Sequence, residues 1–280
     1  MKKSAGRGTR ERGVAGAGEV RVRRAYFECR FGQLNVRTAF PASGGFDERT
    51  TLLCLHAETG SSRMFVKLLP QIAPDRSVYA PDLPGCGESD APPRPGSIAD
   101  YAGAMGDFID TMHFRQLDVL GCGAGALMAV ELALARPQIV RLLVLVSPSS
   151  LSGGDQSSPA SNRDLGLALH NGPEVQWISN AAQDYKSVER LPLIKQPTLL
   201  ARSKEEVSEY GSRVWQSLRG ARTLELPERG AESLIAAPQV VMQQLREFLD
   251  GHWGRCCRGR AVQGGSVTCR SDLPRGGSYV

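Results

Sequence analysis

Apolar residues follow two spacings along the chain, one typical of buried strands and one typical of helices. A continuous apolar run predicts a strand buried on both faces at residues 51–56, and residues 116–121, 139–148 and 196–203 are further predicted strands. Other strand patterns lie in residues 25–40, as an opening hairpin, and within residues 76–90 and 221–228. Helical spacing, with Ser61 or Ser62 and Ser97 as caps, occurs in residues 61–73, 97–112, 124–136, 206–220 and 237–251. Strands that alternate with helices predict an α/β fold, in which helices cover both faces of a mostly parallel sheet.

The two ends of the chain differ in composition from its middle. Of the 280 residues 41% are hydrophobic, which is enough for a large core. Residues 1–24 carry eight Lys or Arg against two Glu, and residues 251–280 carry five Arg against one Asp. The net charge of +5 therefore belongs to the ends, which are rich in Gly and poor in large apolar residues. We expect disordered basic tails around a domain at 25–250, interrupted by a polar insertion at 149–195.

Several classes of protein are disfavoured by what the sequence lacks. No apolar run is long enough to cross a bilayer, and the basic N-terminus has no apolar segment of the kind found in signal peptides. These absences favour a cytoplasmic protein. The tail cysteines Cys256, Cys257 and Cys269 do not have the spacing of a zinc site, so we expect free thiols and no metal or cofactor.

The segment from Gly121 to Ala126, Gly-Cys-Gly-Ala-Gly-Ala, joins a predicted strand to a predicted helix and is the candidate functional turn. Its spacing is compatible with a dinucleotide-binding turn and with the glycine motif of S-adenosylmethionine-dependent methyltransferases. Both alternatives require a carboxylate at the end of the next strand, but that strand ends in "LVLVSPSS". Neither nucleotide is therefore favoured.

The motifs around this turn give a more specific match. The stretches "LLCLHAETGSS", "RSVYAPDLPGCGESDAPP" and "RPQIVRLLVLVSP" flank it in the order typical of the α/β-hydrolase fold family, and over residues 25–250 the chain resembles that family. The resemblance implies a nucleophile elbow, Gly-x-Ser-x-Gly, with Gly123 at the nucleophile position. It also implies a cap over the sheet, and the short insertion predicts a reduced one.

The resemblance also locates the other members of a catalytic triad. The acid position falls on Glu206, and the histidine position falls on Ala231. Two residues are possible substitutes. Cys122 precedes the nucleophile position and is expected to be buried, whereas His170 lies in the insertion and is the one histidine that could replace the base. His113 and His252 are expected to lie far from the elbow.

The loop that carries oxyanion-hole donors in the family reads His56-Ala57-Glu58 in this chain. Backbone N–H groups of Glu58 and Ala124 could still act as donors, because they do not depend on side-chain identity. His56 is expected to be structural. We expect the Glu58 side chain to point to solvent, since a carboxylate at the site would oppose an oxyanion.

These substitutions favour a catalytically degenerate α/β-hydrolase-fold protein that binds a small apolar ligand or a protein partner. One alternative is an enzyme of the family, such as an ester hydrolase, acyl transferase or lyase, that works without the triad. A second alternative is a polyanion-binding or scaffold protein that acts through its basic tails. Outside those tails, nucleic-acid binding is not expected.

Overall fold

The computed structural model describes residues 20–42, 49–58, 60–146, 173–203, 220–227 and 236–251, together with Leu218. The chain divides into two units, residues 1–250 and 251–280, and of the second only Gly251 is described. The predicted C-terminal tail, most of the N-terminal tail and most of the predicted helix at 206–220 therefore lie outside the described residues.

The described strands form one eight-stranded sheet with the order β1-β2-β4-β3-β5-β6-β7-β8. Only β1 and β2, and β2 and β4, pair antiparallel, while all other neighbours are parallel. The prediction of a mostly parallel sheet is confirmed. The strands are β1 (Arg23–Cys29), β2 (Gly32–Ala39), β3 (Thr51–Leu55), β4 (Val78–Pro81), β5 (Leu117–Cys122), β6 (Val140–Val146), β7 (Thr198–Ser203) and β8 (Arg222–Leu226).

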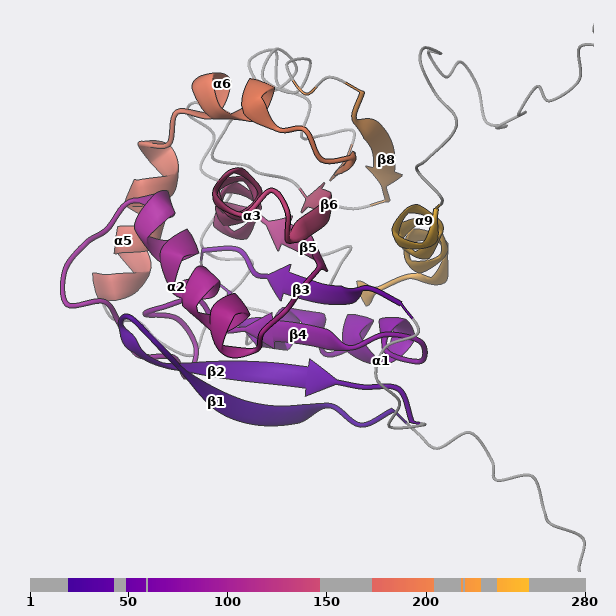
Figure 1. The fold of residues 1–280 in the computed structure, drawn as a ribbon, viewed down its shortest axis with the longest axis horizontal. Coiled ribbons are helices and arrows are strands. Elements are labelled where there is room, and N and C mark those ends of the chain that lie inside the picture. The colour runs from indigo at the N-terminus through magenta and orange to yellow at the C-terminus, as the bar shows by residue number, and fades with distance from the viewer. Residues whose placement is uncertain are drawn as a thin grey trace, which may run out of the picture. The chain divides into compact units, whose positions relative to one another are not determined.

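Helices cover both faces of this sheet (Figure 1). The described helices are η1 (Ser62–Phe65), α1 (Leu68–Ile72), α2 (Ile98–Thr111), α3 (Ala124–Ala135), α5 (Pro173–Gln183), α6 (Ser187–Arg190), η3 (Leu191–Leu193) and α9 (Gln239–Asp250). Helix α2 begins at a capping box in which the Ser97 and Asp100 side chains each accept from the other residue's backbone N–H. This cap is the one that the sequence predicted.

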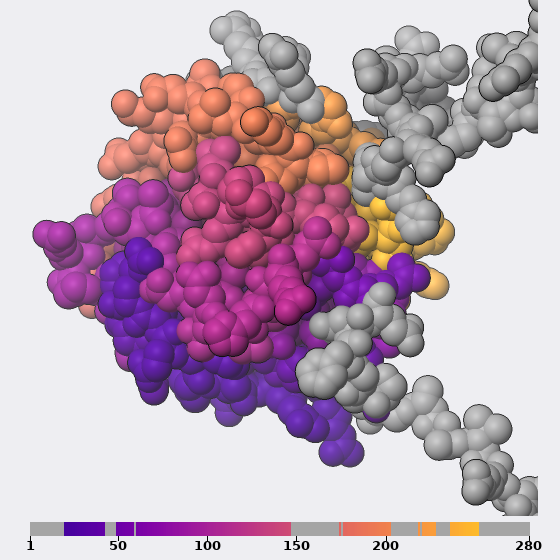
Figure 2. All heavy atoms as spheres, in the orientation of Figure 1, coloured from indigo at the N-terminus to yellow at the C-terminus, as the bar shows by residue number. Residues whose placement is uncertain are grey.

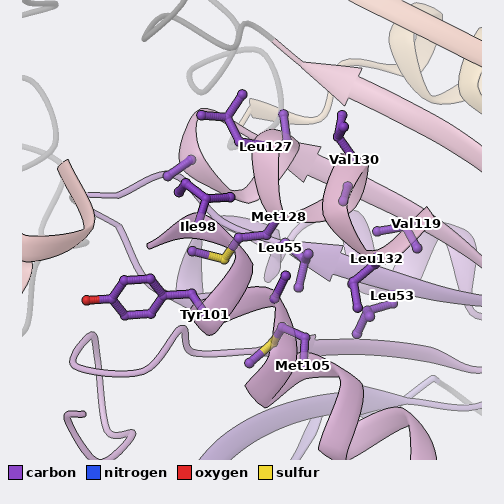
Figure 3. Packing of buried hydrophobic residues seen from close by; sticks show 14 of the residues in the cluster. Leu53, Leu55, Ile98, Tyr101, Met105, Val119, Leu127, Met128, Val130 and Leu132 are labelled. Carbon is purple, nitrogen blue, oxygen red and sulfur yellow. The ribbon is translucent and has the colours of Figure 1, made fainter. Parts of the chain in front are cut away.

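The core between the sheet and helices α2 and α3 is built from alternate residues of the central strands. Leu53 and Leu55 of β3 and Val119 of β5 are buried with Met105 of α2 and Met128 of α3 (Figure 3). Because side chains alternate across a strand, Leu52 and Cys54 face the other side, where α1 and α9 lie. All five residues of β3 are buried, as expected for a strand covered on both faces.

The predicted helix at 61–73 is wrong in one respect, because it is broken. Ser61 caps the short 3-10 helix η1, and an α-helix begins again at Leu68. Pro70 explains the break, since its ring would clash with the Val66 carbonyl in a continuous helix and it has no N–H to donate. The opening strand also differs slightly, beginning at Arg23 rather than Ala25.

The described part of the predicted insertion, residues 173–195, contains α5, α6 and η3, and α5 lies against α3. In Figure 2 the orange surface of this segment lies beside the magenta surface of the elements before it. Glu131 of α3 connects this helix to the inserted segment. Its carboxylate accepts from the Tyr185 hydroxyl at 2.6 Å and pairs with the Arg190 guanidinium at 2.7 Å. The role of this segment as a reduced cap stays a prediction. Among the described residues, no helix is long and apolar enough to cross a membrane.

Candidate functional site

The candidate site is a sharp turn at the carboxyl end of β5, where the strand passes directly into α3. Gly123 forms the turn with φ 54° and ψ −123°, a conformation that a residue with a side chain adopts only with strain. A Cβ at Gly121 would strike the Gly125 carbonyl, and a Cβ at Gly125 would strike the Leu55 carbonyl. The three glycines are therefore required by the tight approach of strand, turn and helix.

The Glu58 side chain lies directly over this turn. Its Oε2 atom accepts a hydrogen bond from the Ala124 backbone N–H at 2.9 Å, and an ideal Cβ at Gly123 would be 2.5 Å from the same oxygen. The expectation that Glu58 points to solvent is therefore wrong. The physical reason is that Ala124 is the first residue of α3, so its N–H has no partner within the helix and lies at the positive end of the helix dipole.

His56 is a structural residue in this arrangement. It is fully buried, and its Nε2 accepts from the Leu83 backbone N–H at 2.8 Å. The ring proton is then on Nδ1, which donates to the Ala57 carbonyl at 2.7 Å. Burial lowers the pKa of His56. Both ring nitrogens are occupied, so this histidine is not available as a general base.

Two buried cysteines lie near the turn, and neither has an environment suited to a nucleophile. Cys122, the last residue of β5, is only 2% exposed, in line with its predicted burial. The Cys86 thiol donates to the Glu58 carbonyl at 3.6 Å, and burial raises the pKa of this thiol. A raised pKa disfavours the thiolate, which is the reactive form.

The structure brings together only some of the predicted site residues. His56, Ala57, Glu58, Cys122, Gly123 and Ala124 meet at the carboxyl ends of β3 and β5. The acid position Glu206, the histidine position Ala231 and the possible base His170 lie outside the described residues. Among the residues described, no group of three or more His, Cys, Asp or Glu side chains could hold a metal ion.

The pairing register of β3 and β5 is the information from which the Glu58 contact could have been predicted. Strands β3 and β5 are parallel neighbours, and Leu55 is paired with Gly121. Glu58 and Ala124 each lie three residues beyond this pair. Two loops that leave adjacent parallel strands at the same level lie side by side, so the carboxylate can reach the helix N-terminus.

The sheet order, the turn after β5 and the covering helices together define the α/β-hydrolase fold. Residues 50–170 match the family model described as alpha/beta hydrolase fold, so this part of the chain is similar to that family. A hydrolase from Pseudomonas aeruginosa has a similar structure, with a TM-score of 0.67 and 21% identity over 81% of this chain and 98% of that one.

Two curated relatives match less than half of the chain. An uncharacterized protein of Mycobacterium tuberculosis is 30% identical over 116 residues, which is 41% of this chain and 33% of the relative. A haloalkane dehalogenase from Mesorhizobium japonicum is 32% identical over 90 residues, or 32% of this chain and 29% of the enzyme. The matches with these relatives thus span about a third of the relatives' own length.

Proposed function

We propose that this chain is a catalytically degenerate member of the α/β-hydrolase fold superfamily, which binds a small ligand at the elbow and does not form a serine acyl-enzyme. The observation that carries the proposal is the Glu58 carboxylate on the Ala124 N–H, above a glycine that has no side chain. Triad hydrolysis needs a nucleophile at this position and a free backbone donor for the oxyanion. Here the nucleophile atom is missing and the donor is already used.

Electrostatics support the same conclusion. A tetrahedral intermediate places a negative oxygen close to the N–H of the residue after the nucleophile. In this chain a second negative charge, the Glu58 carboxylate, already lies 2.9 Å from that N–H. Two negative oxygens that share one N–H donor would lie close together and repel strongly in a partly buried site. The glycine at position 123 and the acid at position 58 therefore disfavour ester hydrolysis by separate physical effects.

The second candidate function is an enzyme of the superfamily that works without the triad. One observation favours it, which is that the relative from Mesorhizobium japonicum is a named enzyme, a haloalkane dehalogenase. Among the described residues near the turn, however, His56 uses both ring nitrogens and Cys122 is buried. The candidate base His170 lies outside the described residues.

Covalent labelling and turnover separate the two candidates. We expect the full chain to show no fluorophosphonate adduct by mass spectrometry, and no p-nitrophenyl acetate hydrolysis above that of the denatured chain. A Cys122→Ser variant serves as the control for acylation of a thiol. Stoichiometric labelling at the elbow, or hydrolysis that is lost on unfolding and kept in Cys122→Ser, would contradict catalytic degeneracy.

A further inference from the structure

We propose that Glu58 makes the elbow an acceptor site, which binds the ammonium or N–H group of an apolar amine rather than the carbonyl oxygen of an ester. The inference rests on the proposed function, because it assumes that no serine chemistry takes place at Gly123. It goes beyond that function by naming the chemical class of the ligand.

The first argument is the incomplete pairing of the Glu58 carboxylate. Its Oε2 atom is bound by the Ala124 N–H, but its Oε1 atom has no hydrogen bond or ion pair with any residue in the described ranges. Other carboxylates withdrawn from solvent are more fully paired. Asp118 is paired with Arg141 through both oxygens, and Glu131 pairs with Arg190 through both. An ionised carboxylate accepts several hydrogen bonds, so Glu58 retains capacity for a donor.

The second argument is where Glu58 lies in the fold. Ligands of open α/β sheets bind outside the carboxyl ends of the strands, and Glu58 follows the carboxyl end of β3 beside that of β5. Apart from Glu58 itself, the atoms nearest to an added Cβ at Gly123 are the uncharged Cβ and Cα of Ala57. A half-buried carboxylate with one unpaired oxygen favours a cation, since a charge-assisted hydrogen bond is stronger there than in water.

The third argument is that the elbow presents a hydrogen-bond acceptor where a hydrolytic site presents donors. An oxyanion hole offers donors to an oxygen, so it selects carbonyl compounds. Here the Ala124 donor is used within the chain, and the group presented in its place is an acceptor. An ester carbonyl would have to displace the carboxylate, whereas an amine can bind to it directly.

Calorimetric titration of the full chain with two probes tests the inference. The probes are N,N-dimethylbenzylammonium and benzyl alcohol, which share an aromatic body and differ in charge. We expect the ammonium probe to bind about tenfold more tightly or better, and we expect Glu58→Gln to remove that difference. Glu247→Gln is the matched control, because Glu247 is exposed on α9, on the far side of the sheet from α3.

Carbodiimide modification of the unmutated chain gives a second readout, which does not depend on how the variants fold. The tertiary ammonium probe cannot form an amide, so it should protect Glu58 from amidation by glycine ethyl ester, and benzyl alcohol should not. Equal binding of the two probes, binding of neither, or a preference that persists in Glu58→Gln would overturn the inference. Fluorophosphonate labelling of the same sample would instead contradict the proposed function, so the two failures are distinguishable.

Discussion

The Glu58 carboxylate accepts a hydrogen bond from the backbone N–H of Ala124 at 2.9 Å, and in the proposed function this N–H is the donor that an α/β hydrolase keeps for its substrate. The two residues are 66 positions apart in the chain and meet because β3 and β5 are adjacent parallel strands. This contact links the helix N-terminus, the glycine turn and the loop after β3 in one arrangement. It also determines how the turn should respond to mutation.

Gly123→Ser should destabilise the protein for two separable reasons. The φ of 54° strains any side chain by about 1–3 kcal/mol, and the new Cβ would be 2.5 Å from Glu58 Oε2. Gly220→Ser is the matched control, because Gly220 has a φ of 77° but nothing within 4 Å of an added Cβ. In urea unfolding, we expect Gly123→Ser to cost at least about 1 kcal/mol more than Gly220→Ser.

A double-mutant cycle assigns this excess cost to a specific contact. Adding Glu58→Ala to Gly123→Ser removes the carboxylate that the serine would strike, so the pair should be less destabilised than the sum of the single variants. Additive effects would show that the carboxylate moves aside freely, and the excess would then need another cause.

Gly125→Ala should be more disruptive than a typical substitution of glycine in a helix. Its Cβ would strike the backbone carbonyls of Leu55 and His56, which belong to the sheet and the adjoining loop and cannot move independently. We expect a loss of about 3 kcal/mol or more in the free energy of unfolding, against about 1 kcal/mol or less of gain or loss for Gly96→Ala. At Gly96 the three atoms nearest to the added Cβ belong to the Asp100 side chain, the closest at 3.2 Å. Similar unfolding midpoints for the two variants would contradict the requirement for close approach.

Asp82 provides a prediction about pH. The buried Asp82 carboxylate accepts from Asn35 Nδ2 at 2.8 Å and from the backbone N–H groups of Ser62 and Glu88 at 2.6 and 2.9 Å. Burial raises the pKa of Asp82, but the His56 ring and these donors lower it more, so the net pKa lies below its ordinary value. A carboxyl with a lowered folded-state pKa stabilises the fold above its unfolded pKa of about 4 and loses that contribution as pH falls.

Asp82→Asn should therefore cost about 2–3 kcal/mol at neutral pH, because an amide group would face N–H donors, and this cost should shrink as pH falls below about 4. Chemical denaturation of both proteins across that range measures the difference. The exposed Asp184→Asn is the control for a general charge effect. A destabilisation that is independent of pH would show that shape, and not ionisation, accounts for the role of Asp82.

Local pattern predicted those parts of the fold that depend on local chemistry. The cap at Ser97, the buried run Thr51–Leu55 and the glycine turn all follow from residue type and spacing, and the structure has each of them. The opening strand begins earlier than predicted, and the exposed Arg24 pairs with Glu88, a contact between residues 64 positions apart. The break before Leu68 was predictable from Pro70, but the apolar spacing around it obscured the signal.

The candidate site was less predictable, because its main contact depends on register. The sequence places Glu58 after one strand and Ala124 after another, but it does not state which strands are neighbours or at what level they pair. Once Leu55 is opposite Gly121, the contact follows. The positions Glu206, Ala231 and His170 rest on sequence alone, since they lie outside the described residues. The effect of mutations at these positions therefore tests the resemblance directly.

Restoring ester hydrolysis should need three substitutions acting together. Gly123→Ser supplies a hydroxyl, Ala231→His supplies a base that Glu206 can orient, and Glu58→Ala frees the Ala124 N–H as an oxyanion donor. Triad members are strongly non-additive, so each single variant should remain at background. The serine–histidine pair should also stay weak, because loss of one oxyanion donor costs about a hundredfold in rate.

The measurement is p-nitrophenyl acetate turnover for the single variants, the pair and the triple variant, with the melting temperature of each. In a matched control, Glu247→Ala replaces Glu58→Ala and should give no more activity than the pair. If the pair is as active as the triple variant, Glu58 does not block the donor. If Gly123→Ser alone is as active, a base already lies over the elbow, and His170 is then the residue to mutate. Activity in the triple variant alone would show that this chain keeps the hydrolase framework and lacks only the nucleophile, the base and the free donor.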